Sequence, residues 1–208
     1  NITEEHPHQL WASDSKVDGE LLDRWRVFRV ANRTEVNGIY GPINRIINYR
    51  DKLYFYQDMA FGIASIDERS VITDQSGQEL VLGSGGVFPD YQYVSTLTGS
   101  YHQFCIVPTE NALYHYDARL KKLFKYTGGP NPISDVKGMK AYFANKLTGA
   151  IQTTDNPIYF NNGERYGISS TYDFRYSELL MTFIDGETKY TVVYGENANE
   201  GKGAFTGF

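Results

Sequence analysis

One stretch decides the fold class of this chain: Leu53-Tyr54-Phe55-Tyr56-Gln57-Asp58-Met59-Ala60-Phe61-Gly62-Ile63-Ala64-Ser65-Ile66. Its two apolar runs, 53–57 and 61–66, flank the short break Asp58-Met59-Ala60. Short runs that are rich in aromatic residues and bounded by turn residues are typical of β-strands. The stretch therefore predicts two strands of an antiparallel hairpin, the first of them buried.

The same rhythm continues on both sides of this stretch. Upstream, residues 43–49 predict a strand that a turn at Arg50-Asp51-Lys52 joins to the first hairpin. Downstream, the runs 71–73 and 79–83 flank a polar turn at 74–77. Together these segments predict a first antiparallel meander.

Two further cycles follow. The second has predicted strands at 103–107, 112–117 and 122–126, turns at 108–111 and 118–121, and an end marked by the Gly- and Pro-rich residues 128–132. The third begins near Ile158 and contains the runs 178–183 and 189–194, with 204–208 as its last strand. Asp185-Gly186-Glu187 separates the two runs, and an Asp-Gly turn between apolar runs is a strong hairpin signal.

Two segments depart from the hairpin pattern. Residues 1–37 are polar apart from Trp25-Arg26-Val27-Phe28-Arg29-Val30, whose alternation predicts a strand. Residues 134–148 predict one helix, because Ser134 can cap it, Asp135 suits its positive end and apolar residues recur at helical spacing. Gly138 weakens this helix by roughly 1 kcal/mol relative to Ala.

The sequence thus predicts a mainly β chain of antiparallel hairpin meanders, with partial β-propeller-like blades and one short helix. A β-sandwich made from the same hairpins is the alternative. The expected division is a polar N-terminal segment with a strand (1–37), two blade-like units (38–133), the helix (134–148) and a third blade-like unit (149–208). Three blades are too few to close a propeller, since typical ones have about four to eight. A start without Met and an abrupt end predict a piece of a longer chain.

Composition argues against several classes of function. With 41% hydrophobic and 15% aromatic residues the chain can build a core, so disorder is not expected. The net charge is −5 and the charges are interleaved, so no basic face for tight nucleic-acid binding is predicted. No apolar run reaches the roughly 18 residues of a membrane-spanning helix. The single Cys105 excludes an intramolecular disulfide and lies in an apolar run that predicts a buried thiol.

No motif predicts catalysis, a cofactor or a metal. The glycine-rich residues 82–86 lack the Lys-Ser/Thr and the helix that follow a phosphate loop. Pro89 and the aromatic residues after it predict a loop between blades instead. His6 and His8 have no third ligand nearby, and no nucleophile elbow accompanies His102 or His115. Counting carboxylates leaves a glycosidase pair open, but Asp58, Asp67, Asp117 and Asp185 fall at predicted turns. The chain is predicted not to be an enzyme and to use no cofactor.

Tyrosines are the remaining signal. Six of them lie in predicted polar loops or strand edges: Tyr91, Tyr93, Tyr101, Tyr166, Tyr172 and Tyr176. Exposed Tyr can stack on sugars or anchor a protein interface, although covering the surface of a blade explains each one taken singly. Tyr166, Tyr172 and Tyr176 are the candidate contacts for a partner or a glycan.

Several segments, in this order, resemble large tail proteins of crAss-like, short-tailed bacteriophages. They are Gly41-Pro42-Ile43-Asn44, residues 52–63, residues 82–86, Leu113-Tyr114-His115-Tyr116-Asp117, residues 134–139, residues 190–196 and Phe205-Thr206-Gly207-Phe208. The resemblance covers about residues 20 to 208.

The resemblance implies a structural protein of the virion tail. The family forms the nozzle, or muzzle, a multi-copy ring with propeller-like domains at the distal end of the tail, and has no catalytic residues to carry over. Expected partners are copies of the same chain in a ring, other tail proteins or fibres, and passing DNA that is not held tightly. The expected roles are lining or closing the DNA-ejection channel and docking other tail proteins.

Two other hypotheses compete with this one. A receptor- or glycan-binding propeller module of a phage tail would use the exposed tyrosines. An enzyme that degrades surface polysaccharide would need two carboxylates at glycosidase distance in an open cleft.

Overall fold

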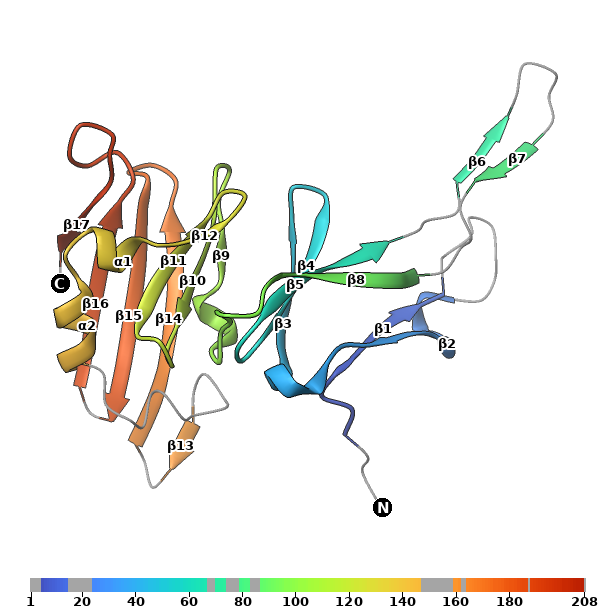
Figure 1. Cartoon of the computed structure of the whole chain (residues 1–208), viewed down its shortest axis with the longest axis horizontal. Helices are drawn as coiled ribbons and strands as arrows, with labels where there is room; N and C mark the ends of the chain where they lie inside the picture. The colour runs from blue at the N-terminus through green and yellow to red at the C-terminus, as the bar shows by residue number, and fades with distance from the viewer. Residues whose placement is uncertain are drawn as a thin grey trace.

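The structure, a computed structural model, describes residues 5–14, 24–66, 70–73, 79–82, 87–146, 159–161, 164–186 and 188–207. In these residues the chain forms antiparallel sheets that follow one another along an elongated molecule (Figure 1). The five-stranded sheet lies near one end of the long axis, and a two-stranded hairpin, residues 70–73 paired with 79–82, reaches the other end (Figure 1).

The first large sheet has four strands in the order β3-β4-β5-β8. These strands are β3 (Ile43–Tyr49), β4 (Lys52–Gln57), β5 (Phe61–Ile66) and β8 (Val87–Ser95). The hairpin of β6 (Ser70–Thr73) and β7 (Glu79–Leu82) projects between β5 and β8. A two-stranded ribbon, β1 (Gln9–Ser13) with β2 (Phe28–Glu35), lies beside this sheet (Figure 1).

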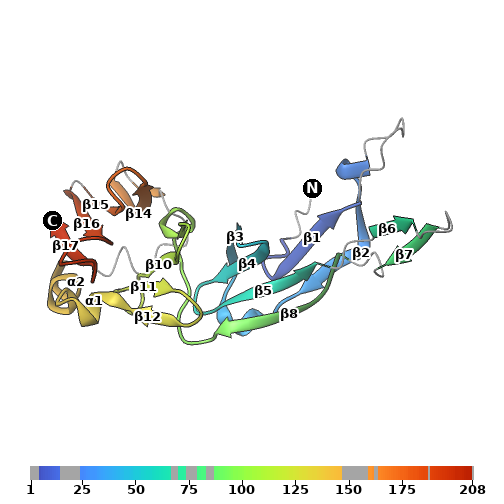
Figure 2. The same ribbon diagram turned by 90° about the horizontal axis from the view of Figure 1, so that it is seen from above.

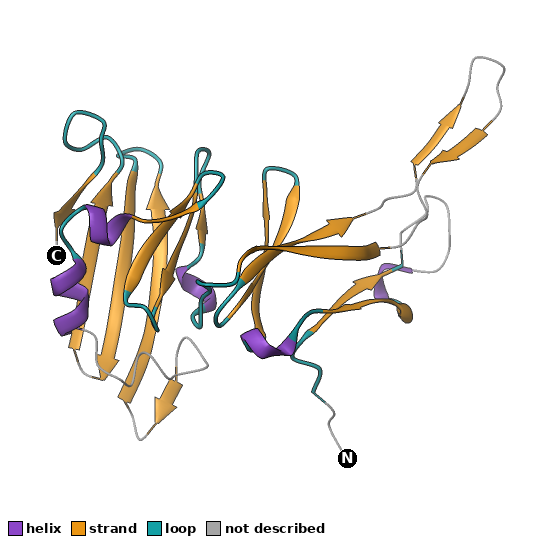
Figure 3. Ribbon diagram, in the orientation of Figure 1, coloured by secondary structure: helices purple, strands orange, loops and turns teal. Residues whose placement is uncertain are grey.

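Two more meanders complete the molecule. The second sheet has the order β12-β11-β10-β9 and the third has the order β13-β14-β15-β16-β17. Their strands are β9 (Val107–Pro108), β10 (Leu113–Asp117), β11 (Lys122–Tyr126), β12 (Pro130–Pro132), β13 (Tyr159–Asn161), β14 (Glu164–Asp173), β15 (Glu178–Gly186), β16 (Thr188–Gly195) and β17 (Ala204–Gly207). Two short helices, α1 (Ile133–Val136) and α2 (Lys140–Lys146), connect the second meander to the third (Figure 3).

Strand β10 is buried on both faces, and this makes the second sheet the centre of the molecule. All five of its residues are buried. Tyr114 and Tyr116 belong to a core shared with Leu179, Met181 and Phe183 of the third sheet. The opposite face of β10 packs against the first sheet. Leu113 joins a core cluster with Tyr54 and Phe61, and the His115 ring lies 5.2 Å from those of Tyr56 and Phe61.

The first sheet is likewise covered on both faces. Tyr54 and Tyr56 face the second sheet, whereas the alternate residue Phe55 packs with Leu10 of β1 and with Val36. Strand alternation alone produces this division, because successive side chains point to opposite faces. The second and third sheets therefore pack face to face across the long axis, and the first sheet, with the ribbon on its other face, continues from them along that axis (Figure 2).

The prediction of a mainly β chain of antiparallel hairpin meanders is confirmed. The predicted hairpin turn at Arg50-Asp51 is present, and both residues have positive φ (50° and 57°), as a two-residue type I′ turn requires. The meanders in the described ranges do not close into a propeller; they pack face to face instead.

Several local predictions were wrong. Residues 103–107, predicted as one strand, begin with a single 3₁₀ turn at Gln103–Cys105, and only Val107–Pro108 pairs with β10. The segment after Pro89, predicted as a loop, is strand β8, and it pairs with β5 at the edge of the sheet, where a proline is tolerated. The predicted strand at 25–30 starts only at Phe28, after a 3₁₀ turn at Arg24–Arg26.

The predicted helix at 134–148 is two helices. Gly138 has φ +80°, a left-handed conformation that an α-helix cannot contain, so the chain breaks between Val136 and Lys140. Ser134 does not cap α1, since its hydroxyl accepts from the Leu123 backbone N–H. The predicted turn at 74–77, the glycines 83–86, Asp67, the region around Ile158 and residues 147–148 lie outside the described residues. No helix in the described ranges has the length and apolar character needed to cross a membrane.

Replacing Gly62 by Ala is expected to destabilise the first sheet. A Cβ at Gly62 would lie 2.5 Å from Cζ of Phe55 and 2.6 Å from the Gln92 carbonyl oxygen. Overpacking of this kind costs about 2–3 kcal/mol, to be measured by urea unfolding. Gly129→Ala is the control, because a Cβ at that position would have no atom within 4 Å. Equal stability of the two variants would contradict the close packing at Gly62.

Acid is expected to weaken the contact between the first and second sheets through His115. Burial lowers the pKa of His115 from 6.5 to about 3, so its contribution is complete above pH 6.5 and is lost progressively as the pH falls towards 3. Stability should fall by about 2 kcal/mol between pH 7 and pH 5 from this residue alone. His115→Phe should remove that part of the pH dependence in urea unfolding. An unchanged pH dependence in the variant would refute the role of His115.

Candidate functional site: a turn-lined polar cavity

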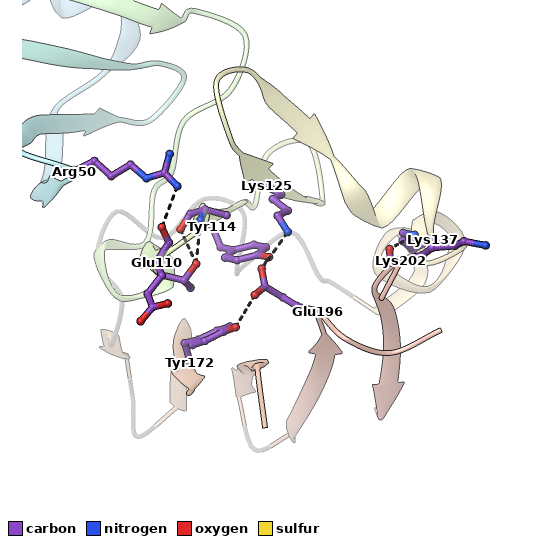
Figure 4. A network of polar contacts seen from close by, with 10 residues as sticks. Arg50, Glu110, Tyr114, Lys125, Lys137, Tyr172, Glu196 and Lys202 are labelled. Atoms are coloured by element: carbon purple, nitrogen blue, oxygen red, sulfur yellow. Dashed lines mark hydrogen bonds and ion pairs between the residues drawn. The ribbon is translucent and has the colours of Figure 1, made fainter. Parts of the chain in front are cut away.

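Turns from the second and third sheets meet at one edge of the molecule and enclose a small polar cavity (Figure 4). Its volume is about 240 Å³. The lining residues come from the β9–β10 turn, the end of β14 with the turn after it, and the loop after β16: Thr109, Glu110, Asn111, Tyr172, Phe174, Ser177, Glu196 and Asn197.

Glu196 organises this cavity, because three donors from different strands converge on its carboxylate. Tyr114 Oη of β10 donates to Oε1, and Lys125 Nζ of β11 lies 3.0 Å from the same oxygen. Tyr172 Oη of β14 donates to Oε2 over 2.6 Å (Figure 4). One carboxylate directly after β16 therefore ties the second sheet to the third.

The electrostatics of this network keep Glu196 charged. Burial would raise the pKa of Glu196, but hydrogen bonds from Tyr114, Tyr172 and Lys125, with the charge of Lys125, outweigh it and lower the pKa. Burial and the hydrogen bond to Glu196 raise the pKa of Tyr172 to about 12, and the same two causes raise that of Tyr114. At neutral pH both tyrosines are therefore protonated donors.

Two further hydrogen bonds, each from a side chain to a distant backbone carbonyl, position turns at this edge of the molecule. Arg50, in the β3–β4 turn, donates from Nη2 to the Glu110 carbonyl oxygen over 3.0 Å, which brings a turn of the first sheet to the same edge. Lys137 Nζ donates to the Lys202 carbonyl oxygen over 2.7 Å and so holds the β16–β17 loop against the end of α1 (Figure 4).

The three tyrosines singled out from the sequence do not form one cluster. Tyr172 lines the cavity and is half-buried. Tyr176 is 61% exposed in the β14–β15 turn, with the Arg175 guanidinium 5.4 Å from its ring centre. Tyr166 lies on β14 opposite Asp185, six residues before Tyr172 and so about 20 Å away along the strand; its side chain lies outside the described part of the structure.

Glu196 does not fit the role of the acid catalyst in a glycosidase pair. Glu110 and Glu196 both line it, but an acid catalyst needs a raised pKa, whereas the pKa of Glu196 is lowered. Burial raises the pKa of Asp117. That side chain is fully buried, however, and its carboxylate accepts from the Gly99 and Leu120 backbone N–H groups, a turn-stabilising role.

The side chains of His115 and Cys105 lie inside the core. His115 is fully buried, with Thr98 Oγ1 3.0 Å from Nε2. Cys105, predicted to be a buried thiol, is 1% exposed, and burial raises its pKa to about 11. Within the described ranges no three His, Cys, Asp or Glu residues lie together as metal ligands would.

Sequence reasoning missed Glu196 as the organiser of this edge. Its one local signal is its place directly after the apolar run of β16, where a strand ends. Its three partners lie 82, 71 and 24 residues earlier in the chain, so no local pattern connects them.

The polar groups at this edge join one antiparallel sheet to the next, which is a structural role for these side chains. The family comparison points to a structural protein. The chain matches the model of the Crassvirus muzzle protein family over residues 1–208, and it therefore belongs to that family. Membership makes the chain a structural component of a bacteriophage virion, and the resemblance inferred from the sequence is confirmed. A search of curated proteins finds no match.

Glu196→Gln is expected to weaken the link between the second and third sheets by about 2 kcal/mol, because charge-assisted hydrogen bonds to Lys125, Tyr114 and Tyr172 are weakened together. Urea unfolding at pH 7 measures this. Because the pKa of Glu196 is lowered, the difference in stability between wild type and variant should also depend on pH. The stabilisation is present above the ordinary glutamate pKa and is lost as the pH falls below it, so wild type and variant should converge in acid.

Glu200→Gln is the matched control for this variant. Its side chain is 88% exposed, and its ion pair with Lys202 spans 4.0 Å, a kind of contact that contributes little. A loss at Glu200 as large as that at Glu196 would show that the network does not join the sheets.

Proposed function

We propose that this chain forms part of the tail nozzle, or muzzle, of a short-tailed phage, where it lines or closes the DNA-ejection channel and docks other tail proteins. It acts there as a homo-oligomer arranged in a ring. The observation that carries the proposal is the family match over residues 1–208.

The layered architecture supports a mechanical role. Each sheet packs against the next through aromatic side chains, and those of β10 are buried on both sides. Such a core resists shear, because close-packed interiors transmit strain rather than absorb it. The blade-like units at 38–133 and 149–208 are proposed to be the rigid parts of the wall, joined through the helical segment 134–148.

The charge of the chain supports the proposed behaviour towards DNA. A net charge of −5 disfavours phosphate binding, so ejected DNA would pass this surface without being retained. No tight complex with DNA is expected at physiological salt.

Imaging the intact phage particle tests the proposal. Density of this chain should form a ring at the distal end of the tail. Density in the capsid or at the tip of a fibre would refute the nozzle assignment.

A receptor- or glycan-binding module of the tail is the second candidate. The observation that favours it is the aromatic turn beside the cavity, where Phe174 is 67% and Tyr176 is 61% exposed. On a glycan array, Tyr→Ala changes at 166, 172 and 176 should abolish any sugar signal under this hypothesis. No sugar signal in the wild type would reject it.

A further inference from the structure

The layers of this molecule end in two surfaces that the described residues do not cover. One is the outer face of the third sheet, turned away from the second sheet. The other is the exposed side of the β1–β2 ribbon. The third sheet lies near one end of the long axis and the ribbon lies towards the other (Figure 1), and the outer face of the third sheet is turned across that axis (Figure 2).

The outer face of the third sheet carries no charge in its central rows. Strand alternation places Ile168, Met181 and Val192 inward, in the core, and their neighbours outward. The outward residues in the central rows are Ser169, Thr171, Leu180, Thr182, Thr191, Val193 and Thr206. Their hydroxyl and apolar groups form a flat surface, with Thr182 and Thr191 hydrogen-bonded to each other over 2.9 Å.

An acidic pair borders this face. Asp173 and Glu178 are directly opposite each other in the β14–β15 register, and both have outward parity. Like charges in this position repel each other. The cation in the same turn, Arg175, has its guanidinium over the Tyr176 ring. Asp173 Oδ1 accepts from the Arg175 and Tyr176 backbone N–H groups over 2.8 and 3.3 Å, and a cation from a partner would relieve the repulsion that remains between the two carboxylates.

The ribbon, together with the 3₁₀ turn that precedes β2, carries large exposed apolar side chains. Trp25, Val27, Phe28 and Val30 are 52%, 44%, 57% and 67% exposed, a concentration of large apolar side chains that marks an interaction surface. Arg26 lies among them and is exposed. Trp, Phe and Arg are the residues that interface cores favour.

We propose that the ribbon of one copy packs on the outer face of the third sheet of the next copy, with Arg26 directed to the Asp173–Glu178 pair. The contact repeats the way in which the layers already pack within one chain. This inference rests on the proposed homo-oligomeric role and adds the surfaces that create it. Because two different surfaces meet, the interface is heterologous, and repetition closes a ring if the rotation permits.

Nucleic acid fits the ribbon less well than a second copy does. A DNA-binding surface holds phosphates through cations, but Arg29 already pairs with Asp14 at 2.7 Å and Arg33 stacks on Trp11 at 5.6 Å. The four exposed apolar side chains would gain nothing from phosphate.

Sedimentation of the purified chain over a concentration series tests the interface. The wild type should self-associate. Val30→Asp on the ribbon and Thr171→Lys on the outer face should each weaken association at least about tenfold. Val136→Asp is the matched control, since this valine of α1 is equally exposed, at 69%, and belongs to neither surface; it should associate as the wild type does.

Mixing the two interface variants gives the sharper result. The intact ribbon of Thr171→Lys can still dock on the intact face of Val30→Asp, so the mixture should form one-to-one dimers and nothing larger. A wild type that stays monomeric, or a mixture that stays monomeric, would overturn the proposal. So would labelled duplex DNA that binds the wild type and is released by Arg26→Ser, because the ribbon would then be a DNA contact.

These outcomes separate this inference from the proposed function. Self-association through both surfaces together with density in the capsid would keep the interface and reject the nozzle. If the chain forms a ring at the tail end but its interface variants associate as the wild type does, the nozzle is kept and the interface is rejected.

Discussion

The rest of this structure depends on the burial of β10 on both faces. Its alternation of Leu113, His115 and Asp117 with Tyr114 and Tyr116 supplies one set of side chains to the first sheet and the other to the third. A strand covered on both sides is unusual in antiparallel meanders, which commonly leave one face in water. Here the burial of β10 on both faces joins hairpins that would each be only marginally stable alone into one packed structure.

His115, Asp117 and Glu196 find their partners through the fold rather than through a sequence motif. His115 remains neutral because burial lowers its pKa, and Asp117 is held by backbone N–H groups of the segments beside it. At the turn-lined edge, Glu196 joins the second and third sheets through hydrogen bonds from Tyr114 and Tyr172. These three titratable residues therefore hold the sheets together, which suits a virion component.

Sequence patterns predicted the strands whose apolar runs are bounded by turn residues, such as β4, β5, β15 and β16. They failed for β8, where Pro89 and the aromatic residues after it indicated a loop, and for β14, whose Ser and Thr residues carry little apolar signal. Pairing with a neighbouring strand decides both cases. The site was harder still: Tyr172 was predicted as a candidate contact for a partner or a glycan, and no local pattern indicates that its hydroxyl donates to Glu196, 24 residues later.

Hydrogen exchange measured by mass spectrometry tests whether the three large sheets form one cooperative unit through β10. We expect peptides covering β4–β5, β10–β11 and β15–β16 to exchange with a common opening free energy and to lose protection together as denaturant is added. Loss of protection in β4–β5 while β10–β11 and β15–β16 stay protected would contradict it, because the first sheet would then be an independent unit.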